Sequence, residues 1–293
     1  MSWLIVSLAI LSLALLGVCY WGAGVILRPP EKAPLAVFPE RYGLRYEKVS
    51  YTTKDGLTLR GWFLPAPNGE NRTILMCHGW GDNKGHLLER THFLSGRGLF
   101  NLLYFDHRSH GESDGEITTI GYLELIDVEA SLDYLREKRP QCLERLGLFG
   151  LSMGGAVGII AAARAPEIKA AVIESSFTHY RTVVRQWAWN KFRIPYFPIV
   201  MLTLWILRRR VGAEEVDSQS PIEHVGRIAP RPLFFIAGGR DDLMPEREVR
   251  ALHERAGPPK ELWVIPEAGH AQCFAVAGHE YEERVIGFYR KYL

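Results

Sequence analysis

A serine stands in a short glycine-rich segment whose surroundings favour a catalytic nucleophile. The segment 150–155, Gly-Leu-Ser-Met-Gly-Gly, follows the apolar run 145–149 and opens the small-residue stretch 154–165. A serine on a tight turn between a strand and a helix projects its hydroxyl clear of the sheet, and the following amide nitrogens point into the same space. The positions two before and two after Ser152 must be small, and both are glycine. The alternative is a glycine-rich turn that contains a serine by chance.

A serine hydroxyl needs a general base, and the base needs a group that orients it. Asp241 follows the strand-like run 233–237, and His270 follows the run 262–265. Both lie just beyond the carboxyl ends of predicted strands, as Ser152 does, and ligands of open α/β sheets bind at that edge. These three residue types fit acyl transfer with Ser152 as nucleophile, His270 as general base and Asp241 as the orienting acid.

The elements that must position these residues alternate along the chain. Strand-like runs lie at 46–51, 57–64, 73–77, 100–105, 145–149, 170–173, 233–237 and 262–265. Helical patterns lie at 85–97, 122–139, 154–165, 246–255 and 278–292. Continuous apolar strands separated by helices predict an α/β fold, with a mostly parallel central sheet and helices on both faces.

The N-terminal leader is predicted to anchor the chain in a membrane. Residues Trp3 to Leu27 contain no charged side chain, and about 20 apolar residues in a helix cross a bilayer core. Trp3 and Trp21 can lie near the two interfaces. The alternative is a cleaved secretory signal, but the apolar run is longer than such signals use and no Lys or Arg precedes it. The leader is expected to supply location rather than chemistry.

The charges after the leader predict its orientation. Arg28, Lys32, Arg41 and Arg45 follow the span and nothing basic precedes it except the amino terminus. The positive-inside rule then places the main domain on the cytoplasmic side of a single-pass membrane protein. Four prolines between 28 and 40 predict a stiff linker, assigned to 28–45.

The motifs together give a resemblance. The sequence resembles α/β-hydrolase-fold serine hydrolases, of the group similar to serine aminopeptidase (S33-type) and to membrane-anchored α/β-hydrolase-domain proteins. The resemblance covers residues 46–293, which are assigned to the α/β-hydrolase domain. The order Ser152, Asp241, His270 is the order expected of that fold. The segment 238–245, Gly-Gly-Arg-Asp-Asp-Leu-Met-Pro, resembles the family's acid loop, and its register implies Asp241 as the acid, with Asp242 as the alternative.

The resemblance also implies an oxyanion hole after the third strand. The run 73–77 leads into His78-Gly79-Trp80, and the backbone N–H groups of Trp80 and Met153 are implied as the two donors. Such donors stabilise the charge that develops on a carbonyl oxygen. His78 is a competing candidate for the base, although its place matches the family's structural His-Gly.

The segment 106–113, Asp-His-Arg-Ser-His-Gly-Glu-Ser, resembles a structural turn of the family in which serine replaces the usual glycine at 109. Asp106 and Arg108 are expected to pair there, and His110 to hydrogen-bond locally. A metal site at His107 and His110 is the alternative. No cofactor and no metal are expected to be required.

A long insertion separates two of the predicted strands. It is predicted to form a lid at about residues 175–220, and from Ser175 to Ala213 it contains seven Arg or Lys residues and no Asp or Glu. Tyr180, Val183, Val184 and Trp187 share a helical face. One interpretation is a lid packed over the active site. The other is a lid that also docks on an anionic membrane surface.

Composition limits the function classes. The 293 residues are 47% hydrophobic and 23% charged, which is globular, and the net charge of +2 gives no indication of nucleic-acid binding. The sequence therefore predicts a membrane-anchored serine hydrolase of carboxylic esters, lipid esters among them. An aminopeptidase or amidase stays open, because the same triad cleaves both bond types. A non-catalytic, membrane-anchored homologue that binds a ligand is the second alternative.

Overall fold

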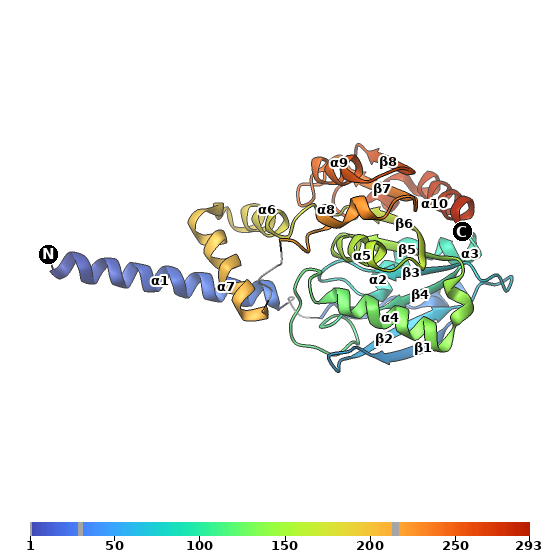
Figure 1. Cartoon of the computed structure of the whole chain (residues 1–293), viewed down its shortest axis with the longest axis horizontal. Helices are drawn as coiled ribbons and strands as arrows, with labels where there is room; N and C mark the ends of the chain where they lie inside the picture. Colours follow the sequence, from blue (N-terminus) through green and yellow to red (C-terminus); the bar gives the residue numbers. More distant parts are fainter. Residues whose placement is uncertain (1, 29–31, 213–216) are drawn as a thin grey trace.

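The computed structural model describes residues 2–28, 32–212 and 217–293, and it contains one sheet with a long helix projecting from the domain (Figure 1). The strands are β1 (Glu47–Thr52), β2 (Thr58–Leu64), β3 (Thr73–Cys77), β4 (Asn101–Phe105), β5 (Leu146–Leu151), β6 (Ile168–Glu174), β7 (Leu233–Gly238) and β8 (Lys260–Ile265). Their order across the sheet is β1-β2-β4-β3-β5-β6-β7-β8. The pairs β1–β2 and β2–β4 are antiparallel, whereas all the pairs from β4 to β8 are parallel.

Helices cover both faces of this sheet, as the alternation of patterns predicts. The domain helices are α2 (Lys84–Thr91), α3 (Phe93–Gly96), α4 (Glu124–Lys138), α5 (Met153–Arg164), α8 (Pro221–His224), α9 (Glu246–Arg255) and α10 (Cys273–Tyr292). Buried residues of α4, α5 and α9 belong to one hydrophobic core, and those of α2, α3 and α10 to the other. Side chains of β3 alternate between the two: Leu75 and Cys77 face the first, Ile74 and Met76 the second.

Two helices differ from the sequence prediction. The helix predicted at 85–97 is two helices, α2 and α3, which meet at His92. The last helix begins at Cys273 rather than at Gly278, and it has a kink at Gly278, whose φ is 50°. Because glycine has no Cβ, it adopts this left-handed conformation at low cost, so a position that looks like a helix start lies inside the helix.

The N-terminal helix α1 (Ser2–Leu27) joins the domain at its last turns. Cys19, Ala23, Ile26 and Leu27 are buried, whereas the side chains from Trp3 to Val18 are exposed except for that of Leu15, which is partly buried. The helix packs against α7 (Met201–Val211), which belongs to the insertion together with α6 (Tyr180–Phe192) and a short helical turn (Tyr196–Val200). The backbone N–H of Thr118 also donates to the carbonyl of Leu27 at 2.7 Å.

The segment between α1 and β1 lies on the domain surface over the residues that the structure describes. Lys32 Nζ donates to the Ser113 carbonyl at 2.7 Å, and the side-chain amide of Asn83 donates to the carbonyl of Ala33 at 3.0 Å. Val37 is buried. The described part of the predicted linker therefore lies against the domain.

The turn after β4 is built differently from the sequence expectation. The predicted pair of Asp106 with Arg108 is wrong, because both side chains bind other partners. Asp106 accepts hydrogen bonds from the backbone N–H and the ammonium group of Lys84, at the start of α2. Arg108 points to the other side, where it forms ion pairs with Asp55 and Asp127. Each of the two charges is buried and therefore needs a paired partner, and α2, α4 and the β1–β2 turn supply these partners.

Ser109 takes the place that the resemblance assigns to glycine. Its φ is 64°, in the region that favours glycine. Its Oγ donates to the carbonyl of Ile117 at 2.7 Å, so the hydroxyl fixes the strained turn to the following loop.

Two histidines of this turn, His107 and His110, lie against His78, and all three are buried. The ring of His78 is 4.9 Å from that of His107 and 5.1 Å from that of His110. Burial lowers the pKa of His107 to about 3 and the pKa values of His78 and His110 to about 4. All three are therefore neutral in the folded protein above pH 5.

The depressed pKa of His107 predicts a pH-dependent contribution to stability. The unfolded chain protonates this side chain near pH 6.5, whereas the folded one does not until about pH 3, so stability falls as pH drops below 6.5. When the pH falls from 7 to 4.5, one such histidine lowers the free energy of unfolding by about 2 kcal/mol. His107→Phe replaces a ring whose nitrogens make no hydrogen bond in the described structure. Between the two pH values, this variant is expected to lose about 2 kcal/mol less unfolding free energy than wild type. Urea unfolding of detergent-solubilised protein at both pH values measures the difference, and His279→Phe, at an exposed site, is the control.

Candidate active site

Ser152 lies at the turn between β5 and α5, and its backbone is strained. Its φ and ψ are 55° and −114°. A Cβ at position 154 would overlap the carbonyl group of Cys77 at the end of β3, and one at position 150 would lie 2.5 Å from the carbonyl oxygen of Gly154. The two glycines are therefore required by packing, in agreement with the spacing argument from sequence.

His270 and Asp241 meet Ser152 at the carboxyl edge of the sheet. The Ser152 hydroxyl donates to His270 Nε2 at 3.0 Å, and His270 Nδ1 donates to Asp241 Oδ2 at 2.8 Å. Asp241 is buried at 4% exposure and Ser152 at 8%. The structure thus brings together the three residues predicted from sequence, in hydrogen-bond reach of one another.

The geometry also separates Asp241 from its neighbour Asp242. Asp241 Oδ1 accepts hydrogen bonds from the backbone N–H groups of Leu243 and Met244 at 3.0 and 2.7 Å. Both carboxylate oxygens of this buried side chain are therefore occupied. The side chain of Asp242 is exposed, and its carbonyl accepts from Gln186 and Asn190 of α6. The insertion is thus hydrogen-bonded directly to the acid loop.

Two neutral histidines fix the loop that follows β3. His78 Nδ1 donates to the Gly79 carbonyl at 2.7 Å, and His78 Nε2 accepts from the His107 backbone N–H at 2.9 Å. His110 Nε2 accepts from the Gly81 N–H at 3.0 Å. Each ring needs one bare nitrogen for these bonds, and the lowered pKa of each provides it. His78 is fully buried with both nitrogens engaged, so it positions the loop instead of acting as a base.

The same loop lies against Ser152. A Cβ at Gly79 would be 3.4 Å from the Ser152 Cβ, so the backbone of Trp80 follows immediately beside the serine. Met153 is the first residue of α5. Its N–H belongs to the first turn of the helix, which has no intrahelical acceptor. The two implied oxyanion donors therefore come from segments that converge on Ser152.

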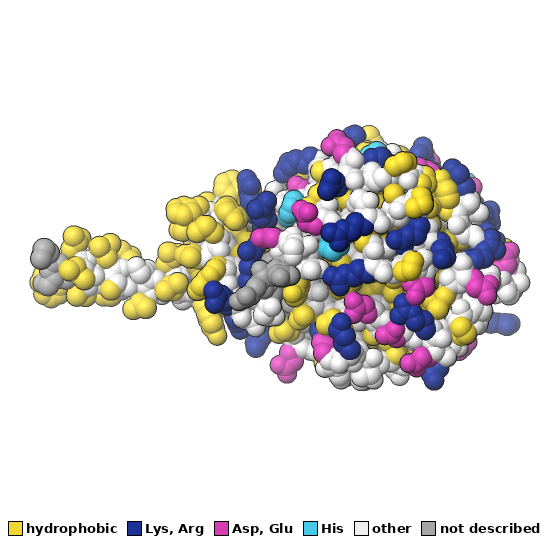
Figure 2. Space-filling model, in the orientation of Figure 1, with side chains coloured by type: hydrophobic (Ala, Val, Ile, Leu, Met, Phe, Trp, Pro, Cys, Tyr) yellow, Lys and Arg dark blue, Asp and Glu magenta, His cyan; other side chains and the backbone are white. Residues whose placement is uncertain are grey.

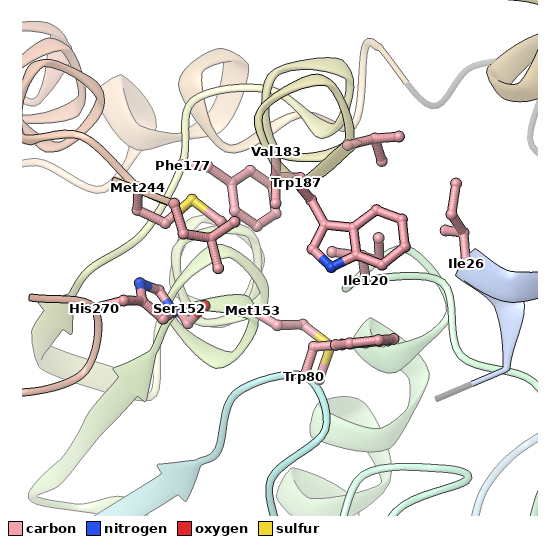
Figure 3. Close-up of a pocket in the computed structure, with 12 residues that line it drawn as sticks. Ile26, Trp80, Ile120, Ser152, Met153, Phe177, Val183, Trp187, Met244 and His270 are labelled. Atoms are coloured by element: carbon pink, nitrogen blue, oxygen red, sulfur yellow. Dashed lines mark hydrogen bonds between the residues drawn. The ribbon is translucent and has the colours of Figure 1, made fainter. Parts of the chain in front are cut away.

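An apolar cavity of about 610 Å³, counting space open to solvent, opens onto Ser152 and His270 (Figure 3). Its lining is mostly aliphatic and aromatic: Ile26, Trp80, Ile120, Met153, Phe177, Val183, Val184, Trp187, Leu243 and Met244 join the serine and the histidine. The helical face predicted for the insertion supplies part of this wall, since Val183, Val184 and Trp187 lie on α6.

The contribution of Ile26 was not predicted from sequence. The leader is expected to supply location rather than chemistry, and Ile26, in the last turn of α1, also lines the cavity that holds Ser152 (Figure 3). The length of the leader could have indicated this contact. Its uncharged run of 25 residues is longer than a bilayer core needs, so its last residues can reach the domain. The indole of Trp80 was also missed. It forms part of the cavity wall, and its Nε1 is buried without a hydrogen-bond partner in the described structure.

The chain matches a family model described as serine aminopeptidase, S33, over residues 69–227. The uncharacterized protein YfhR of Escherichia coli K12 is 29% identical over 249 residues, which are 83% of this chain and 80% of that protein. The Arabidopsis thaliana alpha/beta hydrolase domain-containing protein WAV2 is 24% identical over 271 residues, 87% of this chain and 82% of that protein. Among solved structures, the Pyrococcus furiosus esterase Pf2001 is 28% identical with a TM-score of 0.76, covering 91% of this chain and 98% of its own. The α/β-hydrolase fold is thereby confirmed.

Proposed function

The chain belongs to the serine aminopeptidase (S33) family of α/β-hydrolases, and on that premise we propose that it is a membrane-anchored serine hydrolase of carboxylic esters. The observation that carries this proposal is the hydrogen-bonded series from Ser152 through His270 to Asp241 beside an apolar cavity. A similar structure, Pf2001, is described as an esterase. This series argues against a non-catalytic homologue.

In the proposed reaction, Ser152 Oγ attacks the ester carbonyl carbon while His270 Nε2 takes its proton. Asp241 accepts the Nδ1–H of His270, which fixes the tautomer and stabilises the imidazolium. The negative charge on the carbonyl oxygen is held by the N–H groups of Trp80 and Met153. Collapse of the tetrahedral intermediate expels the alcohol, which takes the proton from His270, and water then hydrolyses the acyl-enzyme by the same steps.

The cavity favours esters over peptides with a free amino terminus. An aminopeptidase must bind the substrate ammonium group, and a buried cation needs a paired charge. No described residue that lines the cavity is acidic. Asp241 lies behind His270, and its carboxylate is already hydrogen-bonded. An apolar acyl group fits this lining because burial of its surface is favourable.

We infer further that α1 stays in place as a single membrane span. Its 26 residues give a helix of about 39 Å, enough to cross a bilayer core of about 30 Å. Cleavage after residue 24 would remove the buried side chains of Cys19 and Ala23 and separate Ile26 and Leu27 from the rest of their helix. Seven basic residues in the insertion, together with those after the span, favour the cytoplasmic side.

Ser152→Ala is expected to abolish both ester hydrolysis and covalent labelling by a fluorophosphonate, because no other group can form the acyl-enzyme. Ser50→Ala, at an exposed site in β1, is the matched control and should label normally. Labelling measured by gel fluorescence and esterase turnover with a short p-nitrophenyl ester report the result. Persistent labelling of the Ser152→Ala protein at a serine would refute the nucleophile.

Asp241→Asn is expected to lower turnover by roughly 10²–10⁴, because the amide favours the wrong imidazole tautomer. Asp242→Asn makes the same chemical change one residue later, at an exposed side chain, and should stay close to wild type. Steady-state kinetics of both variants on one ester provide the comparison. The reverse order of activities would move the acid to Asp242.

Protein purified from membranes is expected to retain Trp3–Leu27 by intact mass and to remain in the pellet after alkaline carbonate extraction. The packing of the last turns of α1 into the domain is the reason for retention, and the length of its apolar run is the reason for resistance to carbonate. A mature chain that begins after residue 24 and appears in the supernatant would contradict the anchor.

A further inference from the structure

A second apolar cavity, of about 650 Å³ counting space open to solvent, lies between α1 and the insertion. Val18 and Val25 line it from α1, Ala188 and Phe192 from α6, and Val200 from the turn before α7. Nothing in the proposed reaction uses this space. Burial of hydrocarbon against such a lining is favourable.

The two cavities adjoin. Ile26, Val184 and Trp187 line both of them. In Figure 3, Trp187 and Ile26 lie on the side of the first cavity that is away from His270, and Ile26 belongs to α1. A route from the surface of α1 to the proposed nucleophile would therefore pass these three apolar side chains.

The position of this route along α1 places it at the membrane surface. Trp3 and Trp21 are 18 residues apart in one helix, about 27 Å, which is close to the thickness of the hydrocarbon core. If each tryptophan lies at an interface, as aromatic belts do, Val18 lies inside the hydrocarbon. Val25 and Ile26 then lie outside it, beside the domain. The second cavity thus crosses the interface.

The tip of the insertion, which comprises the turn Tyr196–Val200 and the first residues of α7, lies beside the part of α1 that lines the second cavity. Cys19 Sγ donates to the carbonyl of Ile199 at 3.5 Å, which sets the turn before α7 beside Cys19. Phe197 and Trp205 in this part of the insertion are 70% and 55% exposed. Figure 2 shows hydrophobic side chains along α1 and over the adjoining tip, with Lys and Arg side chains gathered between them and the rest of the domain.

The basic side chains mark where lipid headgroups would lie. Arg210 stacks on the ring of Tyr20 at 4.7 Å, one residue before Trp21. Arg209 stacks on Trp205 at 5.4 Å, and both arginines are exposed. Cations beside exposed aromatic rings at this depth match an anionic headgroup layer.

We propose that the second cavity binds the fatty-acyl chain of a bilayer lipid ester, which enters sideways from the membrane between α1 and the insertion. The chain then extends past Ile26 and Trp187 and presents its carbonyl carbon to Ser152. The inference rests on the proposed ester hydrolase function and specifies its substrate. Under it, α1 is a wall of the substrate site as well as an anchor.

The test compares two substitutions in α1 that make the same change of side chain. Val25→Trp fills the second cavity, whereas Val6→Trp adds the same bulk at a lipid-facing position that is 51% exposed. The full chain is reconstituted in vesicles of phosphatidylcholine and phosphatidylglycerol. The measured quantity is the ratio of kcat/KM for p-nitrophenyl palmitate to that for p-nitrophenyl acetate. The acetate also reports whether each variant is folded.

Val25→Trp is expected to lower this ratio at least tenfold, equivalent to about 1.4 kcal/mol, because the long chain loses its apolar contacts. Val6→Trp should keep the wild-type ratio. Equal ratios in all three proteins would overturn the acyl-chain site while leaving the ester hydrolase in place. Wild-type protein that hydrolyses neither ester would refute the proposed function itself.

A covalent probe gives a second measurement that does not depend on turnover of Val25→Trp. A hexadecyl fluorophosphonate with a diazirine near the chain end reacts with Ser152 Oγ, which displaces fluoride. Irradiation is then expected to cross-link the chain to residues 18–25 of α1 or 188–200 of the insertion. Cross-links confined to other parts of the domain would overturn the proposal.

Discussion

The strained backbone of Ser152 at the end of β5 is possible only because the residues two before and two after it, Gly150 and Gly154, have no side chains. Gly154 packs directly on the carbonyl group of Cys77, so the start of α5 and the end of β3 come into backbone contact. This contact places the loop after β3 beside the serine. His78 and His110 then hold that loop through hydrogen bonds that require neutral rings. Burial keeps the rings neutral by lowering their pKa values, so the strained turn depends on the core beneath it.

The other half of the site depends on a similar backbone contact between two loops. The Gly239 N–H donates to the Ile265 carbonyl, and the Arg240 N–H donates to the Ala268 carbonyl, both at 2.9 Å. A Cβ at Gly238 would overlap the carbonyl group of Ala268. The acid loop and the histidine loop therefore form one unit at the ends of β7 and β8. Their joint position brings Asp241 within 2.8 Å of His270.

Most of the strands and helices, and the three candidate reactive residues, could be predicted from short sequence patterns, because each pattern spans only a few positions. The strand at Thr73–Cys77 and the helix at Glu246–Arg255 match the predicted bounds. The partners of Asp106 and Arg108 could not be predicted from the sequence, since they lie on α2, α4 and the β1–β2 turn. The contribution of Ile26 was missed for the same reason. It depends on how α1 docks on the insertion, which no local spacing encodes.

The docking of α1 links the proposed membrane span to the site through the insertion. On one side, α6 donates hydrogen bonds from Gln186 and Asn190 to the carbonyl of Asp242, next to the proposed acid. On the other, α7 packs along α1. Burial of Ile26 and of Leu27 stabilises the protein by about 1.5–3 kcal/mol each. A chain that begins after Leu27 would therefore expose the inner face of the insertion and loosen its hold on the acid loop. If α1 crosses the membrane as proposed, the fold itself sets the height of Ser152 above the bilayer, since Ile26 of the same helix lines the cavity.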